Sequence, residues 1–328
     1  VECGESFYND RIPGTIVELD GMGHVEEAEN GAKIAWVKPV LNYPLILQKG
    51  DGGYGYDSTD AAAIRYRTQE LNARWLIYVT DMGQQGHFEG IFELARKAGW
   101  LGEAGDSVRV DHVGFGVVQG KDKKRFKTRS GETVRLVDLL DEAKDRVSKL
   151  LKERCAGGET HILDSEVEEV SSAIGYGAVK YADLRANRQK DYVFDYDAML
   201  NLNGDTAVYL LYAHARFASI IKKSGKDPRQ LLLSNPSLSA SYGTPQENAL
   251  QAKLLSFNDV LLEIMGDLMP HHLCGYLYDL SSCISQFNSH CRVLGSAEED
   301  ARLVLCAATA VVMRTSLNLL GIQPLMRL

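Results

Sequence analysis

The sequence lacks any apolar stretch close to the roughly 18 residues that a membrane-spanning helix needs, which argues against an integral membrane protein. Residues 1–10 have neither a basic segment nor an apolar core, so no secretory signal peptide is expected. The six cysteines form no CxxC pair, which is typical of reduced thiols in the cytosol. The first residue is Val1 rather than Met, from which we expect that the native polypeptide is longer.

Several catalytic signatures are also missing. A P-loop is excluded because Asp122 follows Gly120-Lys121 and Phe115 stands where the first glycine belongs. No G-x-S-x-G elbow of a serine hydrolase is present, and Asp and Glu form no evident acid/base pair. The histidines and cysteines of segment 271–291 match no zinc spacing, so they are expected to have structural roles and no metal site is predicted.

What the chain does contain is typical of a globular protein of two or three domains. It has 328 residues, of which 45% are hydrophobic and 24% charged. This hydrophobic fraction is enough to form a sizeable core. Its net charge is -8, so the field of the whole molecule repels nucleic acid. Any contact with RNA must therefore come from local basic patches.

The first 120 residues predict alternating strands and helices. Apolar runs at 44–48, 75–80 and 110–119 predict strands, and 58–71 and 87–98 predict helices, the first capped by Asp57 or Ser58. This order predicts a βαβαβ unit with a parallel sheet. Ligands of such sheets bind beyond the carboxyl ends of the strands, which here are segments 49–57 and 81–87 and the residues after 119.

From residue 133 onward the pattern is helical. Helices are predicted at about 134–155, 165–181 (opened by a Ser165/Glu168 capping box), 205–224 (capped by Asp205), 248–292 and 297–320. The expected fold class is therefore α/β followed by all-α.

Two polar segments at the strand ends suggest binding chemistry. Segment 121–129 has six cations and one anion, a mixture that suits phosphate groups, although a solvated loop explains it as well. Segment 51–60 does not match a dinucleotide-binding fingerprint, because the third glycine is missing. Within it, Tyr56 and Asp60 lie four residues apart and share a helix face. A carboxylate beside an aromatic ring suits a guanidinium, or Asp60 simply stabilises the helix N-terminus.

Several segments together resemble arginyl-tRNA synthetases. They are DGGYGYDSTDAAAI (51–64), IYVTDMGQ (77–84), HVGFGVV (112–118), KRFKTRSG (124–131), YADL (181–184), TAVYLLYAHARFASI (206–220) and LGIQP (320–324). These are class I aminoacyl-tRNA synthetases. The similarity covers nearly the whole chain and is to eukaryotic, plant-like forms. The resemblance implies the second half of a Rossmann-type nucleotide fold, followed by a helical-bundle anticodon-binding domain. The implied domains are 1–132 (partial catalytic), 133–203 (helical stem-contact segment) and 204–328 (anticodon-binding).

The resemblance also implies site residues and ligands. Tyr56, Asp60 and Gln84 match positions that hold the arginine side chain. The ligands implied are arginine, ATP with Mg²⁺ and tRNA, without a structural metal and without a membrane. The remaining implied residues form three groups: Lys124, Lys127 and Arg129 as catalytic cations of a degenerate KMSKS-like loop; His112, Gly114, Phe115, Val117 and Ser130 at ATP; and Arg216, Lys222, Lys223, Lys226 and Arg229 at tRNA.

The sequence departs from the family pattern in one respect, because the upstream His-x-Gly-His signature is absent. His112-Val-Gly-Phe115 only echoes it. We therefore expect a half-sheet with an unpaired edge and an exposed apolar face, and an isolated 328-residue chain that makes no arginyl-adenylate. The first hypothesis is an arginine-tRNA ligase as the full-length protein, cytoplasmic or organellar. The alternative is a synthetase-derived, non-catalytic structural or RNA-binding subunit, with a partner protein that covers the half-sheet.

Overall fold

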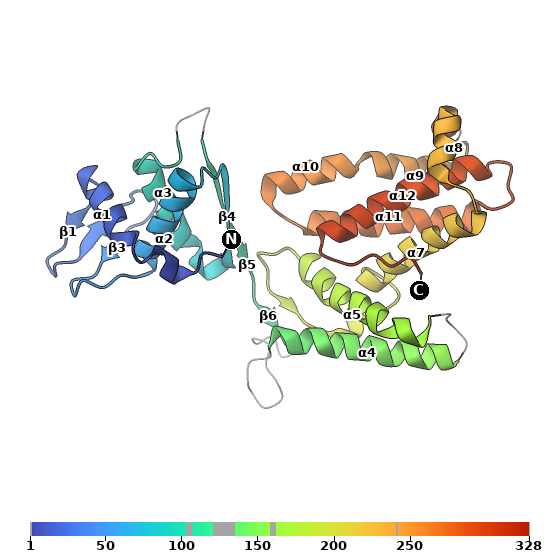
Figure 1. The fold of residues 1–328 in the computed structure, drawn as a ribbon, viewed down its shortest axis with the longest axis horizontal. Helices are drawn as coiled ribbons and strands as arrows, with labels where there is room; N and C mark the ends of the chain where they lie inside the picture. Colours follow the sequence, from blue (N-terminus) through green and yellow to red (C-terminus); the bar gives the residue numbers. More distant parts are fainter. Residues whose placement is uncertain (1, 103–106, 121–134, 158–161, 241, 328) are drawn as a thin grey trace. The chain divides into compact units, whose positions relative to one another are not determined.

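A computed structural model of the protein describes residues 2–102, 107–120, 135–157, 162–240 and 242–327 (Figure 1). The chain forms two compact units, residues 1–116 and residues 117–328, called here the first and the second unit. An α/β unit followed by a helical unit confirms the predicted fold class. The domain boundaries expected at 132/133 and 203/204 stay predictions.

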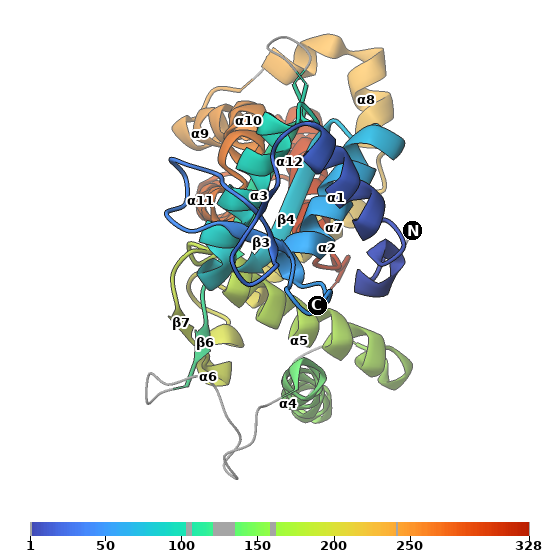
Figure 2. The same cartoon turned by 90° about the vertical axis from the view of Figure 1, so that its left-hand side faces the viewer.

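The first unit alternates helices and strands along the chain, as Figure 2 shows for its labelled elements. Its elements are η1 (Glu5–Tyr8), α1 (Ile12–Gly21), β1 (Glu26–Glu27), β2 (Lys33–Ala35), β3 (Leu45–Gln48), α2 (Tyr56–Arg65), the π-helical η2 (Tyr66–Glu70), β4 (Trp75–Asp81), η3 (Met82–Gln84), α3 (Gln85–Lys97) and β5 (Arg109–Phe115).

The strands of the first unit form two sheets, which corrects the prediction of one parallel sheet. β4 and β5 are parallel, with Tyr78 opposite His112 and Thr80 opposite Gly114. β3 instead pairs antiparallel with β2, which also pairs with β1. The apolar run of β3 indicates a strand but not its neighbour, because alternation of buried and exposed residues is common to both kinds of pairing.

The strands of the first unit are covered on one face. Leu45 and Leu47 of β3 and Leu76 and Tyr78 of β4 are buried in a core that α1, α2 and α3 complete. The alternate residues are exposed, among them Ile77 at 47%, Val79 at 63% and Phe115 at 45%. The exposed apolar face expected from the sequence is therefore present in the described part of this unit.

The second unit is almost entirely helical. Its elements are β6 (Val118–Gln119), α4 (Leu136–Ala156), η4 (Asp164–Glu166), α5 (Val167–Leu184), β7 (Tyr192–Val193), α6 (Tyr196–Met199), α7 (Ala207–Ser224), α8 (Pro228–Ser234), η5 (Pro236–Ala240), α9 (Pro245–Leu255), α10 (Phe257–Asp267), α11 (His271–His290) and α12 (Glu299–Leu319).

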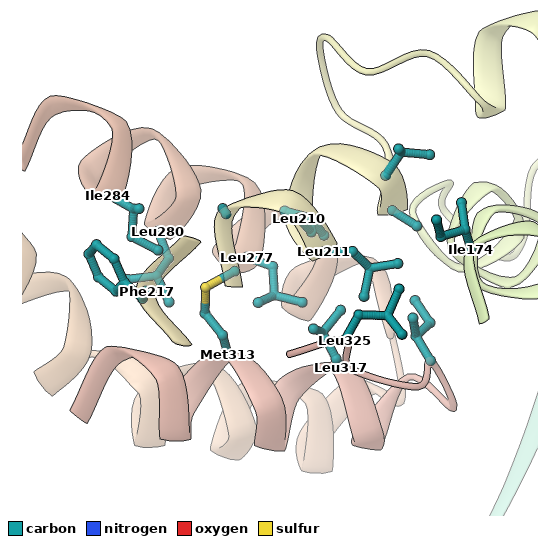
Figure 3. Close-up of a cluster of buried hydrophobic side chains, with 14 of the residues drawn as sticks. Ile174, Leu210, Leu211, Phe217, Leu277, Leu280, Ile284, Met313, Leu317 and Leu325 are labelled. Carbon is teal, nitrogen blue, oxygen red and sulfur yellow. The ribbon is translucent and has the colours of Figure 1, made fainter. Parts of the chain in front are cut away.

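The core of the second unit lies between α5, α7, α11 and α12. Figure 3 shows side chains of these helices pointing toward one another, among them Phe217 of α7, Leu280 of α11 and Met313 of α12, all fully buried. Among the described helices, α12 alone is long and apolar enough to cross a membrane. More than half of its apolar window is buried inside the protein, which is typical of a core helix.

Helix starts differ in detail from the predictions. α2 begins at Tyr56, and Ser58 acts from inside the helix, where its Oγ accepts from the Gly55 N–H (3.2 Å). α7 is capped by Thr206, not by Asp205, which accepts a hydrogen bond from the Tyr181 hydroxyl instead (2.5 Å). In η4 the Glu166 carboxylate accepts from the Leu163 N–H (3.1 Å) and takes the place of the predicted Ser165/Glu168 box. The sequence therefore indicates that a helix begins in each region, but not which side chain accepts from which backbone N–H.

Segment 248–292 forms three helices rather than the long one predicted. α10 ends at Leu268, which has a left-handed backbone (φ 57°), and Pro270 precedes α11. A proline has no N–H to donate and disfavours helical geometry in the residue before it, so the chain cannot continue as one helix.

Candidate functional site

The first turn of α2 presents the residues predicted to bind arginine. Tyr56 is the first residue of the helix and is 73% exposed, and Asp60 follows one turn later with a quarter of its side chain exposed. Asp57 anchors this turn to the sheet, because its Oδ2 accepts a hydrogen bond from the Ile46 N–H of β3 (2.6 Å). The Ser58 Oγ–H donates to the carbonyl of Leu47 (2.7 Å) and makes a second link to the same strand.

A residue that the sequence reasoning missed lies between these carboxylates. His87, in the first turn of α3, has its Nε2 2.7 Å from Asp60 Oδ2 and its Nδ1 3.1 Å from Asp57 Oδ1. Hydrogen bonds to Asp57 and Asp60, which outweigh the effect of burial, raise the pKa of His87 to about 9. The histidine is therefore a cation at neutral pH, and the three side chains together have a net charge of -1.

The third residue predicted at arginine follows the end of β4. Gln84 closes η3, and its Nε2 donates to Asp81 Oδ2 (2.8 Å). Asp81 Oδ1 accepts from the Gly83 N–H (2.9 Å), so this carboxylate caps η3 and holds the Gln84 amide. Gln84 is exposed and precedes His87, the partner of Asp60, by three residues.

The residues predicted at ATP in the first unit lie on β5, next to the end of β4. The His112 ring stacks on Phe88 (centroids 5.3 Å apart, 17° between planes), and its Nε2 is 2.8 Å from the Thr80 hydroxyl. Gly114 is buried, and a side chain there would overlap the Met82 thioether. The Phe115 side chain, by contrast, is 45% exposed.

Of the other residues predicted at ATP or pyrophosphate, one lies within the described residues. Val117 opens the second unit, where its N–H donates to Asp191 Oδ1 (2.7 Å). Lys124, Lys127, Arg129 and Ser130 lie outside the described residues. Among the residues that are described, no group of three or more His, Cys, Asp or Glu side chains is placed to hold a metal ion.

The second unit has a cavity of about 660 Å³ with a cationic wall. Arg216 and Lys223 reach it from α7, seven residues apart and hence on one helix face. Tyr212, four residues before Arg216, is 53% exposed at the same cavity. The remaining wall consists of Ala215, Ser219, Ile220, Asn288, Cys291, Arg292, Val293, Leu294 and Arg327.

The structure separates the five cations predicted at tRNA. Lys226 makes ion pairs with Glu299 (2.8 Å) and Asp300 (2.7 Å), so its charge is neutralised by the chain itself. Lys222 and Arg229 are exposed but do not line the cavity. Arg292 and Arg327 do line it and were missed, because neither lies near the basic cluster in the sequence; Arg327 also forms an ion pair with Glu166.

Two family models match the chain, and the first of them extends beyond the first unit into the second. The family model described as tRNA synthetases class I (R), catalytic domain, matches residues 1–196, and the DALR anticodon binding domain matches residues 210–328. The chain is 51% identical to the cytoplasmic arginine--tRNA ligase of Arabidopsis thaliana and 50% identical to the chloroplastic/mitochondrial one, over 328 residues each. It spans all of its own length but only 54% and 50% of those relatives.

Solved structures show the same fold. The crystal structure of arginyl-tRNA synthetase from Plasmodium falciparum superposes with a TM-score of 0.86 at 34% identity, covering 99% of this chain and 54% of that one. The arginyl-tRNA synthetase of Thermus thermophilus superposes with a TM-score of 0.82 at 22% identity, covering 97% of this chain and 58% of that one.

Proposed function

The chain belongs to the class I arginyl-tRNA synthetase family, and from this premise we propose that it forms the arginine pocket, part of the ATP site and the tRNA-binding helical domain of an arginine-tRNA ligase. In that reaction the carboxylate of arginine attacks the α-phosphate of ATP, and pyrophosphate leaves. The arginyl group then passes from the adenylate to a hydroxyl of tRNA, and AMP leaves. The observation that supports the proposal most is the charge of the Asp57–His87–Asp60 group, which is -1 and so complements one guanidinium.

We propose that Asp60 receives the guanidinium, with Tyr56 and Gln84 at its sides. A carboxylate that is one quarter exposed at the end of a helix can accept paired N–H donors from a guanidinium. For the nucleotide, we propose His112, Gly114, Phe115 and Val117 at ATP, which the enzyme would use as its Mg²⁺ complex. The close approach of Gly114 to Met82 leaves no room for a side chain at this point of β5.

The pyrophosphate leaving group is assigned to the cationic segment 121–131. Lys124, Lys127, Arg129 and Ser130 supply three cations and a hydroxyl there. Cations at this position stabilise the charge that develops on the departing pyrophosphate, which is the usual role of such residues in phosphoryl and nucleotidyl transfer.

Asp60→Asn tests the arginine assignment. The measurement is arginine-dependent exchange between pyrophosphate and ATP, and charging of tRNA, by the longest native polypeptide that contains this chain. Loss of the charged hydrogen bonds should lower kcat/KM for arginine by about 10- to 100-fold, mainly through KM. Asp20→Asn, an exposed carboxylate on α1, is the matched control. A wild-type protein without arginine-dependent exchange, or an Asp60→Asn variant with unchanged KM, would contradict the proposal.

For tRNA we propose the cavity of the second unit as the principal contact. Four of its wall residues are cations, of which Arg327 is paired with Glu166. Tyr212 offers a ring on which a base can stack, which suits single-stranded RNA. Lys222, Arg229 and the paired Lys226 are then peripheral contacts.

The salt dependence of tRNA affinity discriminates these roles. Arg216→Ala and Lys223→Ala should each weaken binding and reduce the slope of log K against log salt by about 1, because each removes one phosphate contact. Lys226→Ala is the control, since Glu299 and Asp300 already neutralise that lysine. Equal slopes for all three variants would contradict the assignment.

A second candidate function is a non-catalytic structural or RNA-binding subunit. The observation that favours it is the exposed apolar face of β4 and β5, which a partner protein would cover. The intact mass of the native polypeptide discriminates the two: a mass well above 36.2 kDa with arginine-dependent exchange supports the ligase, and a mass near that value without exchange supports the subunit. We propose a cytoplasmic location, with the organellar relative as the alternative.

A further inference from the structure

His87 joins the fold of the first unit to the carboxylate proposed to bind arginine. The Ile46 N–H of β3 donates to Asp57 Oδ2, Asp57 Oδ1 faces His87 Nδ1 at 3.1 Å, and His87 Nε2 faces Asp60 Oδ2 at 2.7 Å. A continuous series of hydrogen bonds therefore runs from the backbone of a strand to Asp60. Only the last member of the series is a proposed ligand.

The bridge requires the charged form of the histidine. A neutral imidazole has a single N–H and can donate to one carboxylate only, whereas the imidazolium donates to both. When His87 loses its proton, one ring nitrogen must face a carboxylate oxygen with a lone pair on each atom. One of the two hydrogen bonds then breaks. Asp57 keeps its hydrogen bond from the Ile46 N–H in either case, whereas Asp60 depends on His87 for its link to this series.

The position of His87 is otherwise unfavourable for a cation. It is the third residue of α3, and the positive end of the helix dipole lies in this first turn. Burial also opposes its charge. The two carboxylates of α2 overcome both effects, so the cation is maintained by a specific arrangement rather than by the local helix.

Among the described residues, the pKa of His87 is determined by Asp57, by Asp60 and by burial. On its own helix, the Phe88 ring meets the imidazole edge-on (5.0 Å) and separates it from His112 of β5. Tyr78 of β4 interacts electrostatically with Asp60, and burial raises the pKa of Tyr78 to about 12, so it is neutral below pH 10. The titration of His87 is therefore governed by Asp57 and Asp60.

We propose that His87 is a positioning residue of the arginine pocket: clamped between Asp57 and Asp60, its imidazolium fixes the Asp60 carboxylate and reduces the charge of the pocket to that of one carboxylate. This inference rests on the proposed function, because it assumes that Asp60 receives the guanidinium. Without the imidazolium, the pocket would hold two repelling carboxylates, and Asp60 would no longer be held in one orientation.

The geometry is tested first by NMR titration of the histidine rings in the 328-residue chain, which needs no activity. His87 should titrate with a midpoint of about 9, and in Asp57→Asn its midpoint should fall toward the ordinary value near 6.5. His87→Gln identifies the resonance. A wild-type midpoint near 6.5 overturns the inference regardless of any catalytic result.

The role is tested by pyrophosphate exchange in the longest native polypeptide that contains the chain. We expect His87→Gln to raise KM for arginine at least about tenfold, because a charged hydrogen bond and the orientation of Asp60 are both lost, and to leave kcat and KM for ATP within about twofold. In the wild type, KM for arginine should rise as the pH passes about 9. Part of any such rise comes from the α-amino group of arginine, so the decisive quantity is the ratio of variant to wild-type KM, which should fall toward 1 at high pH.

The control is His24→Gln, since His24 is another histidine of the first unit, and its ring is hydrogen-bonded to the carbonyl of Lys97 (3.0 Å) rather than to a carboxylate. It should leave KM and its pH profile unchanged. If the wild type exchanges pyrophosphate but His87→Gln keeps its KM and pH profile, the positioning role is wrong. If the wild type shows no arginine-dependent exchange, the proposed function is wrong, and the titration still decides whether the clamp exists.

Discussion

A buried ion pair in the second unit allows a stability prediction with a magnitude. Glu247 Oε1 and Arg302 Nε are 2.7 Å apart, and their side chains are only 2% and 10% exposed. The second carboxylate oxygen of Glu247 accepts from the N–H groups of Gly243 (3.0 Å) and Thr244 (2.8 Å). Arg302 also donates to the carbonyl of Arg292 (2.8 Å), which is part of the cavity wall. The substitution Glu247→Gln removes the buried negative charge and leaves the guanidinium with Glu298 as its remaining carboxylate partner, at 3.2 Å and half exposed.

The cost of this change follows from the pKa of Glu247. Burial alone would raise it, but hydrogen bonds from Arg302, Thr244 and Gly243 outweigh burial and lower the pKa from 4.5 to about 2. This difference corresponds to about 3 kcal/mol of folding free energy at neutral pH. Breaking a buried pair by removing one partner costs a similar roughly 3–5 kcal/mol. Because the folded pKa is depressed, the contribution is present above about pH 4.5 and is lost as the pH falls toward 2.

The two units can be followed separately during unfolding. All three tryptophans, Trp36, Trp75 and Trp100, lie in the first unit, whereas most helical residues lie in the second. In urea titrations, Glu247→Gln should therefore shift the transition seen by far-ultraviolet circular dichroism by about 3 kcal/mol and the tryptophan fluorescence transition much less. A double-mutant cycle with Arg302→Met should show a coupling of at least about 1 kcal/mol. A circular dichroism shift below about 1 kcal/mol, or strict additivity, would refute the reasoning.

Further predictions concern helix packing in the second unit. A Cβ on Gly175 of α5 would lie 2.6 Å from the backbone nitrogen of Lys144 in α4, so Gly175→Ala should lower the free energy of unfolding by about 1–3 kcal/mol in urea titrations. Gly275 of α11 has open space around it, and Gly275→Ala should raise thermal stability by up to about 1 kcal/mol in calorimetry; a loss there would contradict the packing. Tyr181→Phe removes the hydroxyl that donates to Asp205 and should cost about 1–2 kcal/mol, with a smaller loss when Asp205→Ala is already present.

Most helices and strands were predictable because their patterns are local. The amphipathic period of α3 and α4 and the glycine after α7 fix those elements within a few residues, whatever the rest of the chain does. The pairing of β3 with β2 was not predictable, since it depends on which strand is available at its edge. The break between α9 and α10 at Ser256 also lacks a clear signal, because this residue keeps a nearly helical backbone (φ -77°, ψ 0°).

In the candidate site, too, the residues close together in sequence were predictable, and those brought together by packing were not. Tyr56 and Asp60 were placed on one face of α2 from their spacing alone, and the structure has them at that spacing in the helix. His87 was missed because it follows Asp60 by 27 residues and meets it only through the packing of α2 against α3. Arg292 and Arg327 joined the cationic cavity for the same reason, being brought there by the ends of α11 and of the chain.

In both units, the pairing of charged groups determines what each surface can bind, more than their number does. Two carboxylates and one imidazolium leave the proposed arginine pocket with a charge of -1, whereas a count of acidic residues in segment 51–60 gives -3. In the basic cluster near the end of α7, two carboxylates neutralise Lys226. Arg292 and Arg327, distant in sequence, line the cavity instead, and Arg327 pairs with Glu166. A protein with a net charge of -8 can therefore still present a local group of cations, such as Arg216, Lys223 and Arg292 at one cavity. It follows that substitutions at paired cations such as Lys226 should affect stability more than tRNA affinity, and substitutions at Arg216 should do the opposite.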